Sequence, residues 1–378
     1  MIYLDNAATT AVDIEVLKQM NRVTINNFHN PSAAYKMAAQ SKKILEWSRN
    51  TIAAEINALP ENIIFTSGGT ESDNLAIKGT ARALKKYGNH IIVSPIEHKA
   101  VLNSVKALEK DGFEISYVKV DKDGIVDIDD LIRLIRPETI MICIMYANNE
   151  TGVIQPVKKI GGIAHCHGIV FMCDAVQAVG NLKIDVKECG INLLTASAHK
   201  FNGPKGTGFL YASDRNILTA CIDGGGQEGG LRSGTENVPG IYGMALALKK
   251  NCRSIEKKTA HELRLRNYII NELTNKVPCA CINGSIEKRL PNNVNIRFKG
   301  INAAALVLLL DEMGIMVSSG SACSAKSPKA SHVLTAMGID EEAALSSIRI
   351  TLSGNTRSDE VKAAVNAIKK SVFYLREQ

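Results

Sequence analysis

The sequence predicts an α/β protein in which a large domain, built on a mainly parallel seven-stranded sheet, is joined to a smaller α+β domain. Two observations support this fold class. Between about residues 60 and 245, short apolar runs alternate with helical patterns, as in parallel sheets covered by helices on both faces. From about residue 250, longer charged helical stretches replace that alternation. A chain of 378 residues can bury two such cores.

The large domain is expected to span residues 21–250. Its strands should be the short apolar and β-branched runs that are bounded by turn signals. These runs cover residues 62–66, 90–94, 114–120, 139–146, 168–173, 192–196 and 207–212. Helical patterns over 98–109 and 157–165 follow two of the runs, so we expect helices there to cover the sheet.

The small domain is expected to span residues 251–378. Its elements should be, in order, a helix over 251–276, a strand over 292–298, a helix over 303–313, a Ser- and Gly-rich stretch over 318–328, a strand over 347–352 and a helix over 359–376. We expect the N-terminal segment, residues 1–20, to pack back against this domain.

Composition argues against several classes of protein. The net charge is only +7 and no block of Lys and Arg is long enough for a nucleic-acid patch, so we expect no direct nucleic-acid partner. There is no signal-peptide pattern and no apolar run long enough to span a bilayer, which favours a cytoplasmic protein without a membrane partner. The nine cysteines are scattered, so neither a disulfide scaffold nor a metal site is expected.

Two charged residues follow neighbouring strand patterns. Asp174 ends the run 168–173, and Lys200 lies just beyond the run 192–196, between small and hydroxyl side chains. A lysine in such a place can form a Schiff base, and an aspartate can pair with a pyridine nitrogen. Because ligands bind beyond the carboxyl ends of parallel strands, this pair favours a pyridoxal 5'-phosphate site.

Other residues suit the same cofactor. The stretch 65–74 reads as a strand, a glycine turn and a helix start, which together can hold a phosphate through Gly69 and Thr70. Ser197 and His199 bracket Lys200 and could contact the same phosphate. The alternative for this junction is an ordinary capped turn.

Two polar residues follow further strand patterns. His98, at a helix start, is either a cap or a group that stacks on the cofactor ring and exchanges protons. Asn149 lies either in an Asx-type turn or where it reaches the cofactor's phenolic oxygen or the substrate carboxylate.

Two features of the small domain add to this site. Arg349 interrupts an apolar strand pattern, and a buried guanidinium favours a carboxylate partner. Cys323 lies in the Ser- and Gly-rich stretch close to Lys326, which makes it a candidate nucleophile.

Taken together, these motifs resemble the NifS/IscS cysteine desulfurases of the aminotransferase class V group of pyridoxal phosphate enzymes. The resemblance runs in order through nearly the whole chain. The matching segments are residues 3–10, 30–32, 67–74, 97–100, 148–152, 174–177, 197–200, 224–228, 232–235, 318–323 and 347–349.

The resemblance implies a role for each matching residue. Lys200 would be the Schiff-base lysine, Asp174 the partner of the ring nitrogen, and Gln177 the partner of the ring oxygen, with His98 stacked on the ring. The phosphate would be held by Gly69, Thr70, Ser197, His199 and, from the other subunit of a homodimer, Thr235. Asn149 and Arg349 would hold the substrate carboxylate.

The implied reaction converts L-cysteine to L-alanine and leaves the sulfur as a persulfide on Cys323. From there the sulfur would pass to an acceptor protein, such as an iron–sulfur cluster scaffold or a component of another thiolation pathway.

Three alternatives remain open. The chain could be another pyridoxal phosphate enzyme of this fold, such as a selenocysteine lyase or an aminotransferase, which an amino-acceptor assay would distinguish. It could be a non-catalytic scaffold for sulfur-transfer partners, although the Lys200–Asp174 pair argues against that. A nucleotide-binding protein is the third, but no GxGxxG motif follows the first strand.

Overall fold

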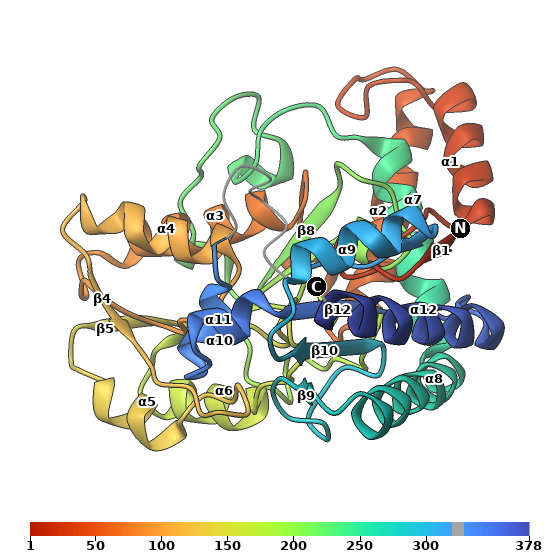
Figure 1. Cartoon of the computed structure of the whole chain (residues 1–378). Coiled ribbons are helices and arrows are strands. Elements are labelled where there is room, and N and C mark those ends of the chain that lie inside the picture. Colours follow the sequence, from red (N-terminus) through yellow and green to blue (C-terminus); the bar gives the residue numbers. More distant parts are fainter. Residues whose placement is uncertain (320–328, 378) are drawn as a thin grey trace.

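The computed structural model describes residues 1–319 and 329–377 (Figure 1). Its centre is a seven-stranded sheet in the order β2-β8-β7-β6-β5-β3-β4. The bounds are β2 Ile63–Thr66, β3 His90–Val93, β4 Glu114–Tyr117, β5 Thr139–Cys143, β6 Val170–Asp174, β7 Leu193–Ser197 and β8 Gly208–Ala212. Each strand overlaps one predicted run. Because β8 alone is antiparallel to its neighbours, β2 and β7, the expected mainly parallel sheet is confirmed.

Side chains alternate between the two faces of this sheet, as the period of a strand requires. Ile64, on one face, belongs to the core that α3 and α4 cover. Its neighbour Phe65 belongs to the opposite core, with α2, α6 and α7. Both faces are therefore buried, which explains why the strands are apolar throughout.

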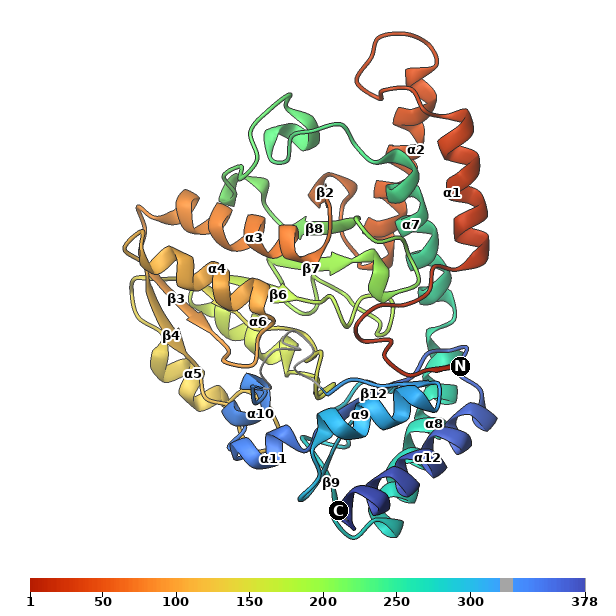
Figure 2. The ribbon, with the colours of Figure 1, turned by 45° about the horizontal axis from the view of Figure 1, so that its top comes forward.

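The helices around the large sheet form two layers, and Figure 2 shows α1, α2 and α7 side by side, away from α4. Their bounds are α1 Ile14–Asn26, α2 Ala38–Glu55, α3 Gly69–Leu84, α4 Lys99–Glu109, α5 Ile128–Leu134, α6 Val157–Cys166 and α7 Val238–Arg253, with short 3-10 turns at Pro60–Asn62, Ala198–Lys200, Arg215–Ile217 and Gln227–Gly230.

A second core lies around α8 Ile255–Lys276, α9 Ala303–Glu312 and α12 Ser358–Arg376. These helices pack on a three-stranded antiparallel sheet of β9 Ala280–Ile282, β10 Asn293–Phe298 and β12 Ser347–Thr351. Two short helices, α10 His332–Ala336 and α11 Glu341–Leu345, complete this part of the chain.

The predicted helix over 251–276 is divided in the structure, because α7 ends at Arg253 and α8 begins at Ile255. The break is at Ser254, whose hydroxyl donates back to the carbonyls of Lys250 and Asn251. A serine that bonds to the preceding turn in this way competes with the continuing helix.

The N-terminal segment contacts both parts of the molecule. Strand β1 (Ile2–Tyr3) pairs with β11 (Ile315–Met316), and Leu4 lies in the second core. From Ile14 onward, however, α1 packs on α7. The domain limits at residues 20 and 250 stay predictions. No helix within the described ranges is both long and apolar enough to cross a bilayer.

Candidate active site

One cavity, of about 640 Å³, opens beside the carboxyl ends of the parallel strands. It gathers nearly all of the predicted site residues that the structure describes. Its lining includes Gly69, Thr70, His98, Asn149, Asp174, Gln177, Ser197, His199, Lys200 and Arg349. These residues come from segments far apart in the sequence, and the sheet edge brings them together.

Lys200 is the last residue of the 3-10 turn that follows β7. At this position its side chain lines the cavity. Its Nζ donates hydrogen bonds to the carbonyl oxygens of Ala7, at 2.6 Å, and Ala8, at 2.9 Å. Burial, helped by the Arg349 guanidinium, lowers the pKa of Lys200 to about 8. A substantial fraction of this amine is therefore neutral, and thus nucleophilic, near neutral pH.

Asp174 is the last residue of β6 and is almost fully buried. The backbone N–H of Val176 donates to its Oδ1 at 2.9 Å. Burial raises the pKa of Asp174, while the nearby His98 and Lys200 act in the opposite direction. A buried carboxyl group of this kind is suited to a cationic N–H partner such as a protonated pyridine nitrogen.

His98 serves as a helix cap and also lines the cavity. The backbone N–H of Ala100 donates to its Nδ1 at 3.2 Å, so the proton of the neutral ring lies on Nε2. Burial lowers the pKa of His98, which favours this neutral form. Capping and a position in the site are therefore compatible at this residue.

The start of α3 presents backbone N–H groups to the cavity. Its N-cap is Gly68, which has no side-chain acceptor, so within the described part of the chain the N-cap leaves the first N–H groups of the helix available to an anion. At Gly69 a Cβ atom would lie 2.8 Å from a methyl group of Val176, so a larger residue would force that side chain to move. His199, which precedes Lys200 in the sequence, lines the same cavity. Burial, together with the charges of Lys200 and Lys205, lowers the pKa of His199 to about 4.

Arg349 and Asn149 meet on the side of the cavity that faces the small sheet. Arg349 donates to the backbone oxygen of Asn149 at 2.8 Å and pairs with Asp5 at 2.6 Å. Its Nε is buried and, within residues 1–319 and 329–377, has no hydrogen-bond acceptor. The neighbouring Asn148, rather than Asn149, accepts the backbone bonds of the Asx-type turn.

These groups fit pyridoxal 5'-phosphate. Lys200 offers an amine to the aldehyde, Asp174 a carboxylate to the ring nitrogen, and the open N-terminus of α3 a set of donors to the phosphate. Ser197 and His199 add side chains beside that helix terminus, and Gln177 lies near Lys200, since both donate to the carbonyl oxygen of Ala7.

Among the described residues, one predicted site residue does not line this cavity, and a second predicted residue cannot be placed. Thr235 is exposed and lies outside the lining. Cys323 lies outside the described residues.

Sequence reasoning missed three acidic residues at the site. Asp5, the partner of Arg349, belongs to a matching segment, which is the one signal that could have drawn attention to it.

Asp73 lines the cavity and accepts a hydrogen bond from Thr195 at 2.7 Å. Glu97 is fully buried and accepts one from the N–H of Met145 at 2.8 Å. Burial, followed by the charge of Asp174, raises the pKa of Asp73; burial likewise raises that of Glu97.

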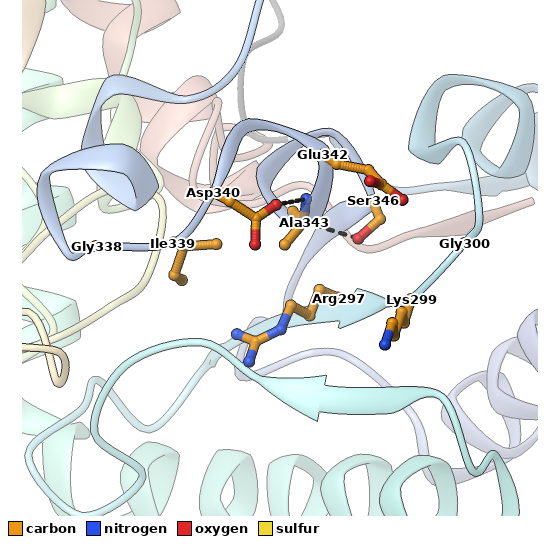
Figure 3. A pocket seen from close by; sticks show the side chains of 9 residues that line it. All are labelled: Arg297, Lys299, Gly300, Gly338, Ile339, Asp340, Glu342, Ala343 and Ser346. Atoms are coloured by element: carbon orange, nitrogen blue, oxygen red, sulfur yellow. Dashed lines mark hydrogen bonds between the residues drawn. The ribbon is translucent and has the colours of Figure 1, made fainter.

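A second hollow, of about 380 Å³, lies between β10 and α11 (Figure 3). Two of its polar side chains serve the local structure. Asp340 caps α11 through the N–H of Ala343, and Arg297 donates to Asn283 at 2.5 Å. None of the predicted site residues that the structure describes lines this hollow.

Comparisons with known proteins agree with this geometry. The model of the family "Aminotransferase class-V" matches residues 2–364. The cysteine desulfurase IscS of Dictyoglomus turgidum is 43% identical over 375 residues, which are 99% of this chain and 95% of that protein. A solved NifS-like protein superposes with a TM-score of 0.93 at 36% identity, covering 99% of this chain and 100% of its own. A structure of SspA in complex with cysteine has a TM-score of 0.83 at 36% identity, covering 94% and 100% of the two chains. The resemblance expected from the motifs is confirmed, and the chain belongs to the aminotransferase class V family, among relatives that are cysteine desulfurases.

Proposed function

We propose that this protein is a cysteine desulfurase that uses pyridoxal 5'-phosphate to convert L-cysteine to L-alanine and transfers the sulfur to Cys323. One observation carries the proposal. A half-buried amine (Lys200), a buried carboxyl group (Asp174) and a buried guanidinium (Arg349) share one cavity at the end of the parallel strands. The full-length desulfurase relatives support the same activity.

The residues of the cavity divide into three groups by what they would hold. Lys200, Asp174, Gln177 and His98 would contact the cofactor ring, and the start of α3 with Ser197 and His199 would contact its phosphate. When bound, pyridoxal phosphate supplies an electron-accepting ring that stabilises negative charge on the substrate carbon next to the amine. Arg349 and Asn149 would bind the substrate carboxylate, for which the Nε of Arg349, without an acceptor among the described residues, is a suitable donor.

Proton movement would depend on Lys200. Its pKa of about 8 allows the amine to take a proton from the substrate's α-carbon and later return it, because both protonation states are accessible near neutral pH. The carbonyl oxygens of Ala7 and Ala8 hold the amine within the cavity during this exchange.

Sulfur transfer would require the thiolate of Cys323. It would attack the substrate sulfur, so that an S–S bond forms while the C–S bond breaks. The electron pair of the C–S bond stays with the carbon, which takes up a proton to give alanine. The persulfide on Cys323 would then pass its outer sulfur to an acceptor protein such as an iron–sulfur scaffold.

We further propose a cytoplasmic homodimer. Thr235 and the glycine-rich residues 224–226 lie in one connection between β8 and α7, and Thr235 is exposed in the single chain. A second copy could present this segment to the phosphate end of its neighbour's cavity.

Incubation of the purified protein with cysteine and pyridoxal phosphate tests the activity. We expect equal amounts of alanine and transferred sulfur in the presence of a thiol reductant. Lys200→Ala should abolish alanine formation. Cys323→Ser should retain the cofactor yet form almost no alanine. Desulfuration by Cys323→Ser at the parental rate would exclude the role proposed for this cysteine.

A further inference from the structure

The helix α10 is tied to two turns of the cavity by the residues at its start. The hydroxyl of Ser331 donates to Oε2 of Glu150 at 2.5 Å. Nε2 of His332 donates to the backbone oxygen of Glu97 at 3.0 Å, since a carbonyl can only accept. Glu150 follows Asn149, and Glu97 precedes His98, so both contacts reach residues adjacent to groups that line the cavity.

The contact between Ser331 and Glu150 is a buried one. Ser331 is 4% exposed and Glu150 is 5% exposed. The same hydroxyl accepts a hydrogen bond from the N–H of Leu334 at 3.2 Å, so Ser331 caps α10 while it donates to Glu150. Burial raises the pKa of the Glu150 carboxyl, and the bond from Ser331 acts against that rise. Ser331 therefore stabilises a carboxylate that is otherwise expensive to bury.

The backbone beside Glu150 is fixed by further contacts. Its carbonyl oxygen accepts hydrogen bonds from Asn293 and Asn295, both at 3.1 Å. The carbonyl oxygen of Asn149 accepts the bond from Arg349 at 2.8 Å. The turn that carries Asn149 is thus held by β10, by β12 and, through the Glu150 side chain, by α10.

We infer that Ser331 is a positioning residue, which acts through Glu150 to hold Asn149 and Arg349 in the geometry that binds the substrate carboxylate. The inference rests on the proposed function. It assigns to α10 a share in substrate affinity, although Ser331 itself is absent from the cavity lining. Lys200 and Asp174 are on other segments, so the cofactor should be held normally without Ser331.

The test compares two ligands that differ in the carboxylate. Cysteine carries this group and cysteamine lacks it, whereas both carry the amine and the thiol. Binding is measured from the change in cofactor absorbance in a Cys323→Ser background, in which cysteine is not consumed. For Ser331→Ala we expect the Kd of cysteine to rise about tenfold, the effect of weakening one hydrogen bond to a charged group. The Kd of cysteamine should change less than about twofold, because cysteamine has no carboxylate for Asn149 and Arg349 to bind.

Three further variants sharpen this result. Ser331→Thr keeps the hydroxyl and should restore the affinity for cysteine. Thr335→Ala is the matched control, since among the described residues the Thr335 hydroxyl bonds to the backbone oxygens of Ser331 and His332 and to no group of the large domain. It should leave both affinities unchanged. If Ser331→Ala fails to fold, Glu150→Gln provides the same comparison, with an expected rise of about threefold for cysteine alone.

Equal losses of affinity for cysteine and cysteamine, or no loss for either, would overturn the inference. The proposed function is tested separately by the parental enzyme. If the parental enzyme makes no alanine from cysteine, the proposed function fails. If it is active and Ser331→Ala binds cysteine normally, only the positioning role fails.

Discussion

The lowered pKa of Lys200 predicts how the attachment of pyridoxal phosphate should depend on pH. Only the neutral amine attacks an aldehyde, so attachment requires that Lys200 lose its proton. Burial is the main cause of the shift, because it disfavours the charged form, and the nearby Arg349 adds to it. Raising the pH should therefore accelerate attachment until the amine is fully neutral.

The structure sets the size of this effect. With a pKa of about 8 instead of 10.5, about 9% of the Lys200 amine is neutral at pH 7, whereas an ordinary lysine has about 0.03%. Lys200 should thus react about 300-fold more readily than a free lysine side chain of equal intrinsic reactivity. The rate should rise about tenfold per pH unit below pH 8 and level off above it.

The assay uses cofactor-free protein mixed with pyridoxal phosphate and quenched with borohydride at intervals. Mass spectrometry of the tryptic peptides then reports the reduced adduct on Lys200. Nα-Acetyl-lysine, whose ε-amine is free, is titrated in parallel and corrects for the ionisation of pyridoxal phosphate itself. Arg349→Gln should move the midpoint to higher pH because it removes a neighbouring positive charge. Lys205→Ala removes another lysine from the cavity lining and should leave the midpoint unchanged.

A pH midpoint for Lys200 near that of Nα-acetyl-lysine would refute the reasoning, because it would mean that burial does not destabilise the charged Lys200 amine. An adduct on Lys205 in place of Lys200 would refute the assignment of the reactive lysine.

Three further predictions concern the cofactor, the dimer and stability. Asp174→Asn should lower cofactor retention on dialysis, since it removes the negative charge expected at the ring nitrogen; undiminished absorbance would contradict this. Light scattering should give the mass of a dimer, and a fully active monomer would exclude the role proposed for Thr235. Glu228→Gln should lower the free energy of unfolding, measured by urea denaturation, by about 3 kcal/mol. The reason is that the buried Glu228 accepts two hydrogen bonds from Arg49 and one from the N–H of Phe65. A decrease of less than about 1 kcal/mol would show that the Arg49–Glu228 pair contributes little to stability.

The large sheet could be predicted because its strands are buried on both faces. A strand such as β6 is then a short, continuous apolar run that ends in a polar residue, here Asp174. The location of the site could be predicted for a related reason, since the carboxyl ends of parallel strands meet at one edge of the sheet. His98 shows that two interpretations of one residue need not exclude each other, because it caps α4 and lines the cavity.

The contacts between distant segments could not be predicted in this way. The apolar surroundings of Arg349 predicted a carboxylate partner, and the structure pairs it with Asp5, 344 positions away. Asp5 is one of 38 acidic residues, and neither propensity nor periodicity distinguishes it from the others. The bond between Ser331 and Glu150 is of the same kind, because only the packing of α10 on the large domain brings the two side chains together.

The contacts of the N-terminal segment have a consequence for how the enzyme is made. Ala7, which accepts a bond from Lys200, is itself held by Thr351, whose hydroxyl accepts from the N–H of Ala7 and whose carbonyl accepts from the side chain of the preceding Asn6. When β8 has left the ribosomal exit tunnel, every strand of the large sheet is available, but the carbonyl of Ala7 that orients the lysine still lacks its anchor on β12. Completion of the lysine site therefore follows the synthesis of the large sheet, and tight loading of the cofactor has to wait until β12 has emerged.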